Sequence, residues 1–282
     1  MLSPRPGTAL LCSFFVSAAC LAAQPDLASG DSLDPDQLEA KGIYMFDGVL
    51  AAAVLYGLED MSHEAGSAEN LLNLEVDWIA GAKPFRSTAK RSLLAKRGEC
   101  GTKRETFARS DCAKEVMGDF ERYGRLASSA KFLRIDFKSS RVSWDGPNEA
   151  LIAGNGREET FGADGTCMAN AICTPVGAFA PRNFKFVVCL HLPANFTNTI
   201  QAGHLPEAQA RALSTRYGDI GHLSTSIIAE LTHPVKALAQ PQQCPLTGNK
   251  VWAEGTIAPR AMTFGDSGNA SFVATSLKYL PR

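Results

Sequence analysis

The stretch "KFLRIDFKS", residues 131–139, marks the point at which the sequence changes its pattern. Apolar and charged side chains alternate here, whereas apolar residues before it recur every three or four positions. Alternation is typical of a strand with one buried face, and the longer period is typical of an amphipathic helix. Helices followed by strands predict an α+β fold: an N-terminal helical region, then a mostly antiparallel β-rich region with one or two helices.

The β-rich region is expected to cover residues 130–282. Alternating runs predict further strands at residues 183–192, 223–231, 250–258 and 270–280, with a helix at residues 205–218. The region is either a domain of its own or continuous with the helical region.

The helical region is expected to cover residues 34–129. Asp34-Pro35 is a favourable helix start, because an N-cap carboxylate accepts backbone N–H bonds and proline tolerates the first turn. The helix predicted over residues 36–61 is apolar nearly all round, which indicates burial in a core. A membrane span is not expected, because the uncharged part of this helix is too short and Asp47 interrupts its apolar residues. Its glycines either admit close neighbours or break it into two pieces. Further helices are predicted at residues 68–83, 84–97 and 112–128.

The first residues resemble an export signal. Arg5 precedes an apolar run over residues 8–23 that ends in Ala-Ala, the pattern of a cleaved secretory peptide. We expect residues 1–23 to be removed, residues 24–33 to form a polar linker, and the mature protein to lie in a bacterial periplasm or outside the cell. The alternatives are a buried N-terminal helix and a lipoprotein anchored at Cys20.

Six cysteines remain in the mature chain: Cys100, Cys112, Cys167, Cys173, Cys189 and Cys244. An even number of cysteines in an exported chain predicts disulfides that stabilise the fold. Pairing sequence neighbours first gives Cys100–Cys112, Cys167–Cys173 and Cys189–Cys244. Neither these spacings nor the scattered histidines match a zinc site, so we expect no metal and no cofactor.

Charge is distributed unevenly, although the net charge is −1. Residues 24–77 are acidic with Lys41 the only basic residue, whereas residues 83–104 are basic with Glu99 the only acid. An inward-facing stripe of Phe85, Ala89 and Leu93 would leave exposed a basic face formed by Arg86, Lys90, Arg91 and Arg97. This face either binds an anionic envelope surface or an acidic protein, or is a solvated helix face offset by the acidic segment. Aromatic residues are not interleaved with it, so nucleic acid is not expected.

Two tetrapeptides match hydrolase patterns. Residues 265–268 spell GDSG, as around a trypsin-like nucleophile, and residues 30–33 spell GDSL, as in a lipase and esterase family. The first lacks the rest of a triad and fits a hairpin turn that contains Ser267. The second lies in the predicted linker, with no buried strand before Ser32. The sequence therefore predicts no catalytic residue.

We expect an exported, disulfide-bonded binding or interaction protein. The alternative is a secreted hydrolase whose active-site residues are dispersed along the chain.

Overall fold

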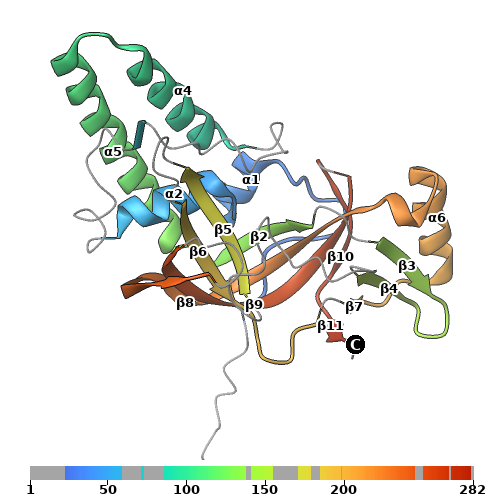
Figure 1. Ribbon diagram of the computed structural model, residues 1–282. Helices are drawn as coiled ribbons and strands as arrows, with labels where there is room; N and C mark the ends of the chain where they lie inside the picture. The colour runs from blue at the N-terminus through green and yellow to red at the C-terminus, as the bar shows by residue number, and fades with distance from the viewer. Residues whose placement is uncertain are drawn as a thin grey trace, which may run out of the picture.

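The computed structural model describes residues 23–58, 71–72, 86–137, 141–154, 171–178, 185–197, 199–244, 250–266 and 268–280 (Figure 1). The fold is a mixed α+β fold, as predicted. The predicted signal peptide up to residue 22, most of the helix expected at residues 68–83, Cys167 and Ser267 lie outside the described residues.

The larger sheet is mixed and mostly antiparallel. Its strands run in the order β1 (Ile43–Met45), β2 (Phe132–Phe137), β8 (Ser224–Gln243), β9 (Lys250–Gly265), β6 (Lys185–His191) and β5 (Ala171–Ala178), with β10 (Ala270–Ala274) paired to the far end of β9. Only the pairs β1–β2 and β6–β9 are parallel among the described strands. The alternating run at residues 131–139 forms β2, which pairs with β8 of the long β8–β9 ribbon.

A smaller antiparallel sheet lies on the opposite side of the molecule from α4 (Thr88–Thr102) and α5 (Thr106–Ser128) (Figure 1). It contains β11 (Leu277–Tyr279), β7 (Thr199–Ala202), β4 (Ala150–Gly154) and β3 (Arg141–Asp145), and α6 (Glu207–Tyr217) lies beside it. The run predicted as one strand at residues 270–280 is therefore divided between the two sheets.

The single helix predicted over residues 36–61 is wrong, because the chain forms α1 (Pro35–Ala40), β1 and α2 (Gly48–Gly57) there. Asp34 caps α1 through its carboxylate, as expected, and Gly42 ends the turn after it with a φ of 73°. A helical region over residues 34–129 is not confirmed, since β1 from this segment joins the larger sheet beside β2.

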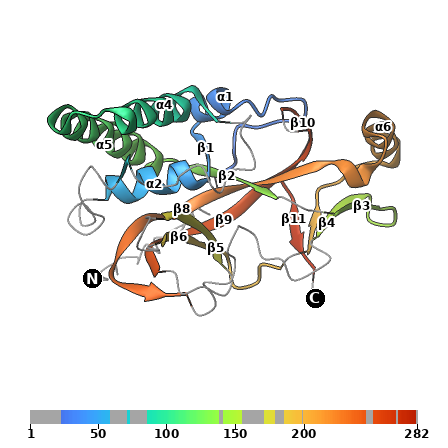
Figure 2. The same ribbon diagram turned by 45° about the horizontal axis from the view of Figure 1, so that its top comes forward.

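The apolar helix α2 is buried, as its composition predicts. It packs between α5 and the strands β5 and β6 (Figure 2). The approach of α2 to α5 requires glycine at position 124, where a Cβ would overlap the carbonyl oxygen of Ala53. The helices are also close at Gly57, where a Cβ would lie 3.2 Å from the backbone nitrogen of Arg125. The glycines of this region thus both interrupt the predicted helix and admit a close neighbour.

The sheet is covered on both faces near its centre, because the adjacent residues Ile227 and Ile228 of β8 are both fully buried. Ile227 belongs to the main core with α2 and α5, whereas Ile228 packs with Leu27, Leu33 and Leu38 of the N-terminal segment. The segment predicted to be a linker at residues 24–33 therefore supplies part of the core.

The disulfide Cys100–Cys112 is confirmed and joins the end of α4 to α5. The pairs predicted for Cys173 and Cys189 are wrong, because these two cysteines are bonded to each other. They face each other across the β5–β6 pair, with Cα atoms 4.1 Å apart, so strand register rather than closeness in sequence sets this pairing. Cys244 is also disulfide-bonded, to a cysteine outside the described residues.

Candidate functional site

The prediction that Lys90 is exposed on a basic face is wrong, because its side chain is buried. Lys90 is 1 % exposed, at the third position of α4. Its Nζ donates a hydrogen bond to the carbonyl oxygen of Met45 at 2.7 Å and lies 2.9 Å from Oδ1 of Asp47. Asp47 also caps α2 by accepting from the Leu50 N–H at 2.8 Å. A buried ammonium group is tolerated when it is paired in this way, so Lys90 connects α4 to the start of α2.

Arg97 and Arg86 of the predicted basic face also contact the protein itself. Arg97 donates to the carbonyl oxygens of Leu71 and Leu72, at 3.0 and 3.4 Å, and Arg86 is half-buried. Ala89, expected to face inward, is exposed, whereas Leu93 is buried as expected and Phe85 lies outside the described residues.

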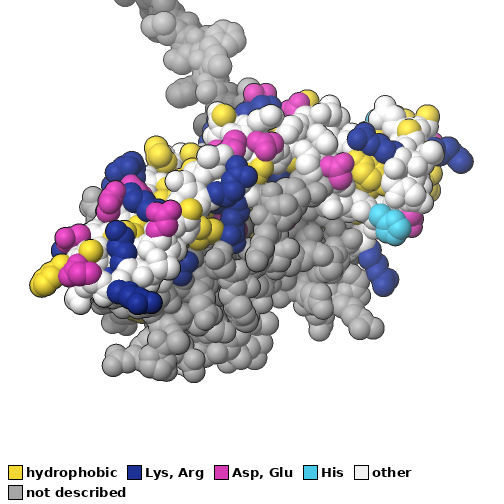
Figure 3. Space-filling model, turned by 90° about the horizontal axis from the view of Figure 1, so that it is seen from above, with side chains coloured by type: hydrophobic (Ala, Val, Ile, Leu, Met, Phe, Trp, Pro, Cys, Tyr) yellow, Lys and Arg dark blue, Asp and Glu magenta, His cyan; other side chains and the backbone are white. Residues whose placement is uncertain are grey.

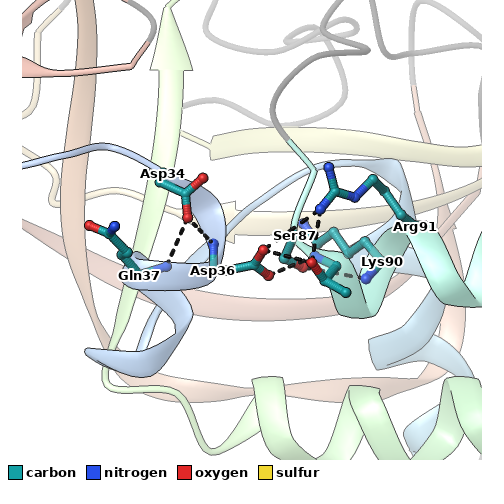
Figure 4. Close-up of polar contacts among 7 residues, drawn as sticks. Asp34, Asp36, Gln37, Ser87, Lys90 and Arg91 are labelled. Carbon is teal, nitrogen blue, oxygen red and sulfur yellow. Dashed lines mark hydrogen bonds and ion pairs between the residues drawn. The ribbon is translucent and has the colours of Figure 1, made fainter.

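The acidic N-terminal segment meets the start of α4 through Asp36 (Figure 4). Its carboxylate accepts from the N–H and hydroxyl of Thr88, at 2.6 and 2.7 Å, and lies 3.7 Å from the Arg91 guanidinium. The hydrogen bonds from Thr88 hold the pKa of Asp36 below its ordinary value. Of the two interpretations of the basic stretch, these contacts favour a helix whose charges are offset by the acidic segment.

A serine pattern at the same place was missed by the sequence analysis. Ser87 and Lys90 have the Ser-x-x-Lys spacing of some acyl-transfer enzymes, in which the serine is the nucleophile. Here the buried Ser87 hydroxyl caps α4 by accepting from the Lys90 N–H at 3.3 Å. The Nζ of Lys90 contacts Asp47 and the Met45 carbonyl oxygen, and the described contacts of Ser87 do not include it. The arrangement stabilises a helix terminus and does not activate a nucleophile.

A second polar contact of the interior joins α5 to α1 through Tyr123. Its hydroxyl donates to Oε1 of Glu39 at 2.6 Å, and its ring packs edge-on against Tyr44 with centroids 6.1 Å apart. Burial, and next the bond to Glu39, raise the pKa of the Tyr123 phenol well above its ordinary value. The neutral, protonated Tyr123 side chain therefore joins α5 to α1.

The two hydrolase-like tetrapeptides pair with each other through their backbones. The N–H of Leu33 donates to the Gly268 carbonyl oxygen at 2.7 Å, and Gly30 and Asp31 exchange hydrogen bonds with Ala270. Oδ1 of Asp266 accepts from Gly268 and Asn269 N–H groups, in the antiparallel hairpin between β9 and β10. The described residues of both tetrapeptides thus form turn and bridge structure, as predicted for the GDSG sequence.

A surface pocket of about 200 Å³ lies beside this junction, between the N-terminal segment, α6 and β10. It is lined by Ser29, Leu205, Gln209, Ala212, Leu213, Ser271 and Phe272. Its hydroxyl groups already have partners: Ser271 contacts the Tyr217 hydroxyl at 2.5 Å, and Ser29 accepts from the Val273 N–H at 2.9 Å. The lining residues are uncharged, so the pocket offers little to select a ligand.

The junction of α4 and α5, which we call the tip (residues 101–108), is the most exposed part of the helical pair. All eight tip residues are exposed, and the pair extends away from the sheet (Figure 1). Phe107 is 78 % exposed; among the described residues, Leu126 at the other end of α5 is the only other large exposed hydrophobic side chain. Lys103 and Arg104 form no ion pair with any described residue. Basic, acidic and hydrophobic side chains intermix at this end of the molecule (Figure 3).

A disulfide and several hydrogen bonds brace the tip at its base. Cys100–Cys112 crosslinks the two helices, and Arg109 donates to the Gly101 carbonyl oxygen at 2.7 Å. The Glu105 carboxylate caps α5 by accepting from the N–H groups of Phe107 and Ala108. The helices predicted at residues 84–97 and 112–128 leave the polar run of residues 101–111 between them, and a lone aromatic residue in that run was the available signal for Phe107.

No protein-family model, curated protein or solved structure matches this chain. Within the described ranges, no helix combines the length and apolar character needed to cross a membrane. In the same ranges, no group of three or more histidine, cysteine or acidic side chains is arranged to hold a metal ion.

Proposed function

We propose that this is an exported, disulfide-bonded protein that acts by binding a partner through the tip of its α4–α5 hairpin. The observation that carries the proposal is Phe107, a large aromatic side chain that is 78 % exposed on a crosslinked projection. An aromatic side chain on a braced element is suited to anchor a partner, because less entropy is lost when a preorganised group binds.

Export is supported by the cysteines. Cys100–Cys112, Cys173–Cys189 and the bonded Cys244 are chemically suited to an oxidising compartment. The apolar N-terminal run that ends at Ala23 fits the same interpretation. Together they favour the periplasm or the extracellular space.

The alternative, a hydrolase with dispersed residues, has less support from the described part of the chain. The serine with the best-placed partners, Ser87, is buried as a helix cap, and Lys90 is engaged by Asp47. The tip is therefore the better-supported functional element.

Site-specific photocrosslinking in the cells that make the protein tests the proposal. A photoreactive phenylalanine analogue at position 107 should form discrete adducts, because this side chain would contact the partner directly. The same analogue in place of Leu126, 57 % exposed at the other end of α5, is the matched control. Equal labelling from both positions, or none from position 107, would refute the proposal.

A further inference from the structure

We infer that the partner of the tip is an anionic lipid surface; this inference rests on the proposed function. The tip combines an exposed aromatic ring, Phe107, with the exposed side chains of Lys103 and Arg104. Membrane-surface proteins use the same combination: the ring enters the headgroup region while the basic side chains meet lipid phosphates.

The charges around the tip favour this partner. Arg109 follows at the start of α5, so the segment from residue 101 to 109 has three basic side chains and one acidic one, Glu105. The Glu105 carboxylate accepts hydrogen bonds from the first turn of α5, where the helix dipole also favours a negative charge. The cations of Lys103 and Arg104 remain available to an outside anion.

The shape of the tip favours a flat surface over a protein groove. The joined ends of α4 and α5 form an extremity of the molecule (Figure 1), and every residue from 101 to 108 is exposed. A projection of this kind can touch a membrane while the body of the protein stays in water. An acidic protein with an apolar pocket is the competing partner, and the experiment below distinguishes it.

The expected binding is weak and reversible. A basic residue near an anionic membrane strengthens binding by about fivefold, and full burial of a phenylalanine side chain by roughly tenfold to a hundredfold. Two cations and one ring therefore stay below the binding of a single fatty-acyl chain, whose association constant is on the order of 10⁴ M⁻¹. The electrostatic part should decline as salt screens the surface.

Vesicle sedimentation with the purified mature protein tests the inference. The probes are phosphatidylcholine vesicles with and without phosphatidylglycerol at about one part in three, at low and high salt (about 0.05 and 0.5 M). We expect binding to the anionic vesicles at low salt only. Replacing Phe107 by Ser, or reversing Lys103 and Arg104 to Glu, should each reduce the association constant at least about tenfold.

Two control variants separate the tip from general effects. Leu126→Ser removes an exposed apolar side chain from the other end of α5, and Arg211→Glu with Arg216→Glu makes the same charge change on α6. Both should bind like the unmodified protein. Equal loss in controls and tip variants, or no binding to anionic vesicles, overturns the lipid inference. If position 107 then still crosslinks a protein, the proposed function stands with a protein partner; if it crosslinks nothing, both fall.

Discussion

Replacing Lys90 by Met should destabilise the protein strongly without affecting the tip. Methionine keeps an unbranched apolar side chain but removes the ammonium group that lies 2.9 Å from Asp47 and 2.7 Å from the Met45 carbonyl oxygen. Asp47 would retain only the bond from the Leu50 N–H among its described contacts. Removing one partner of a fully buried ion pair costs about 3–5 kcal/mol. The Asp47 side chain is 14 % exposed and keeps its cap bond, so we expect Lys90→Met to cost about 3 kcal/mol, at the lower end of that range.

The matched control is Arg91→Met, one residue further along the same helix. Arg91 is exposed and its contact with Asp36 is long, at 3.7 Å, so its replacement should cost at most about 1 kcal/mol. Equilibrium unfolding in urea at neutral pH, with the disulfides intact, measures both free energies.

A double-mutant cycle with Asp47→Asn identifies the cause. If the cost arises from an unpaired carboxylate, Lys90→Met should be less destabilising in the Asp47→Asn background than alone. The reasoning is refuted if Lys90→Met costs no more than Arg91→Met, since Lys90 would then be as solvated as the sequence-based prediction assumed.

Three further predictions concern the fold. Gly124→Ala should lower the free energy of unfolding in urea by about 1–3 kcal/mol, because its Cβ would overlap the Ala53 carbonyl oxygen. The control, Gly118→Ala in the same helix, has open space around its Cβ and should raise that free energy by about 0.5–1 kcal/mol. The opposite order would contradict the close approach of α2 and α5. Because the pKa of Tyr123 is raised by folding, its phenol stabilises the protein fully below pH 10.0, and this contribution is lost as the pH rises further. In Tyr123→Phe the free energy of unfolding should therefore fall less steeply above pH 10.0 than in the unmodified protein. Equal slopes in the two proteins would contradict this. Peptide mapping without reduction should recover Cys173 bonded to Cys189, and a Cys167–Cys173 peptide would contradict the β5–β6 register.

Much of the fold was readable from the sequence because local patterns set it. The alternating run at residues 131–139 forms β2, the helix expected at residues 205–218 forms α6, and the first disulfide joins two neighbouring helices. These elements depend on periodicity and on short-range spacing, which a single sequence contains.

The errors arose where distant segments determine local structure. Residues 43–45 became a strand because β2 offers them a parallel partner, although the surrounding composition is helical. Cys173 pairs with Cys189 because of strand register, which spacing alone does not reveal.

The basic helix was misjudged for a related reason. A lysine in a helical pattern is treated as exposed unless a partner is known, and the partner of Lys90 is 43 positions earlier, at Asp47. Phe107 was overlooked because its neighbours are polar, and only the arrangement of α4 and α5 shows that it lies on a projection.

The central claim is that the basic segment has two roles: Lys90 holds the protein together, whereas the tip contacts an anionic surface. Residue-resolved labelling of lysine amines, read by mass spectrometry with and without phosphatidylglycerol vesicles, tests both roles in the unmodified protein. Lys90 should be unreactive in both conditions, Lys103 should react freely and be protected by vesicles, and the exposed Lys114 on α5 should react equally in both. Labelling of Lys90 as fast as Lys103, or a Lys103 rate unchanged by vesicles, would contradict the account.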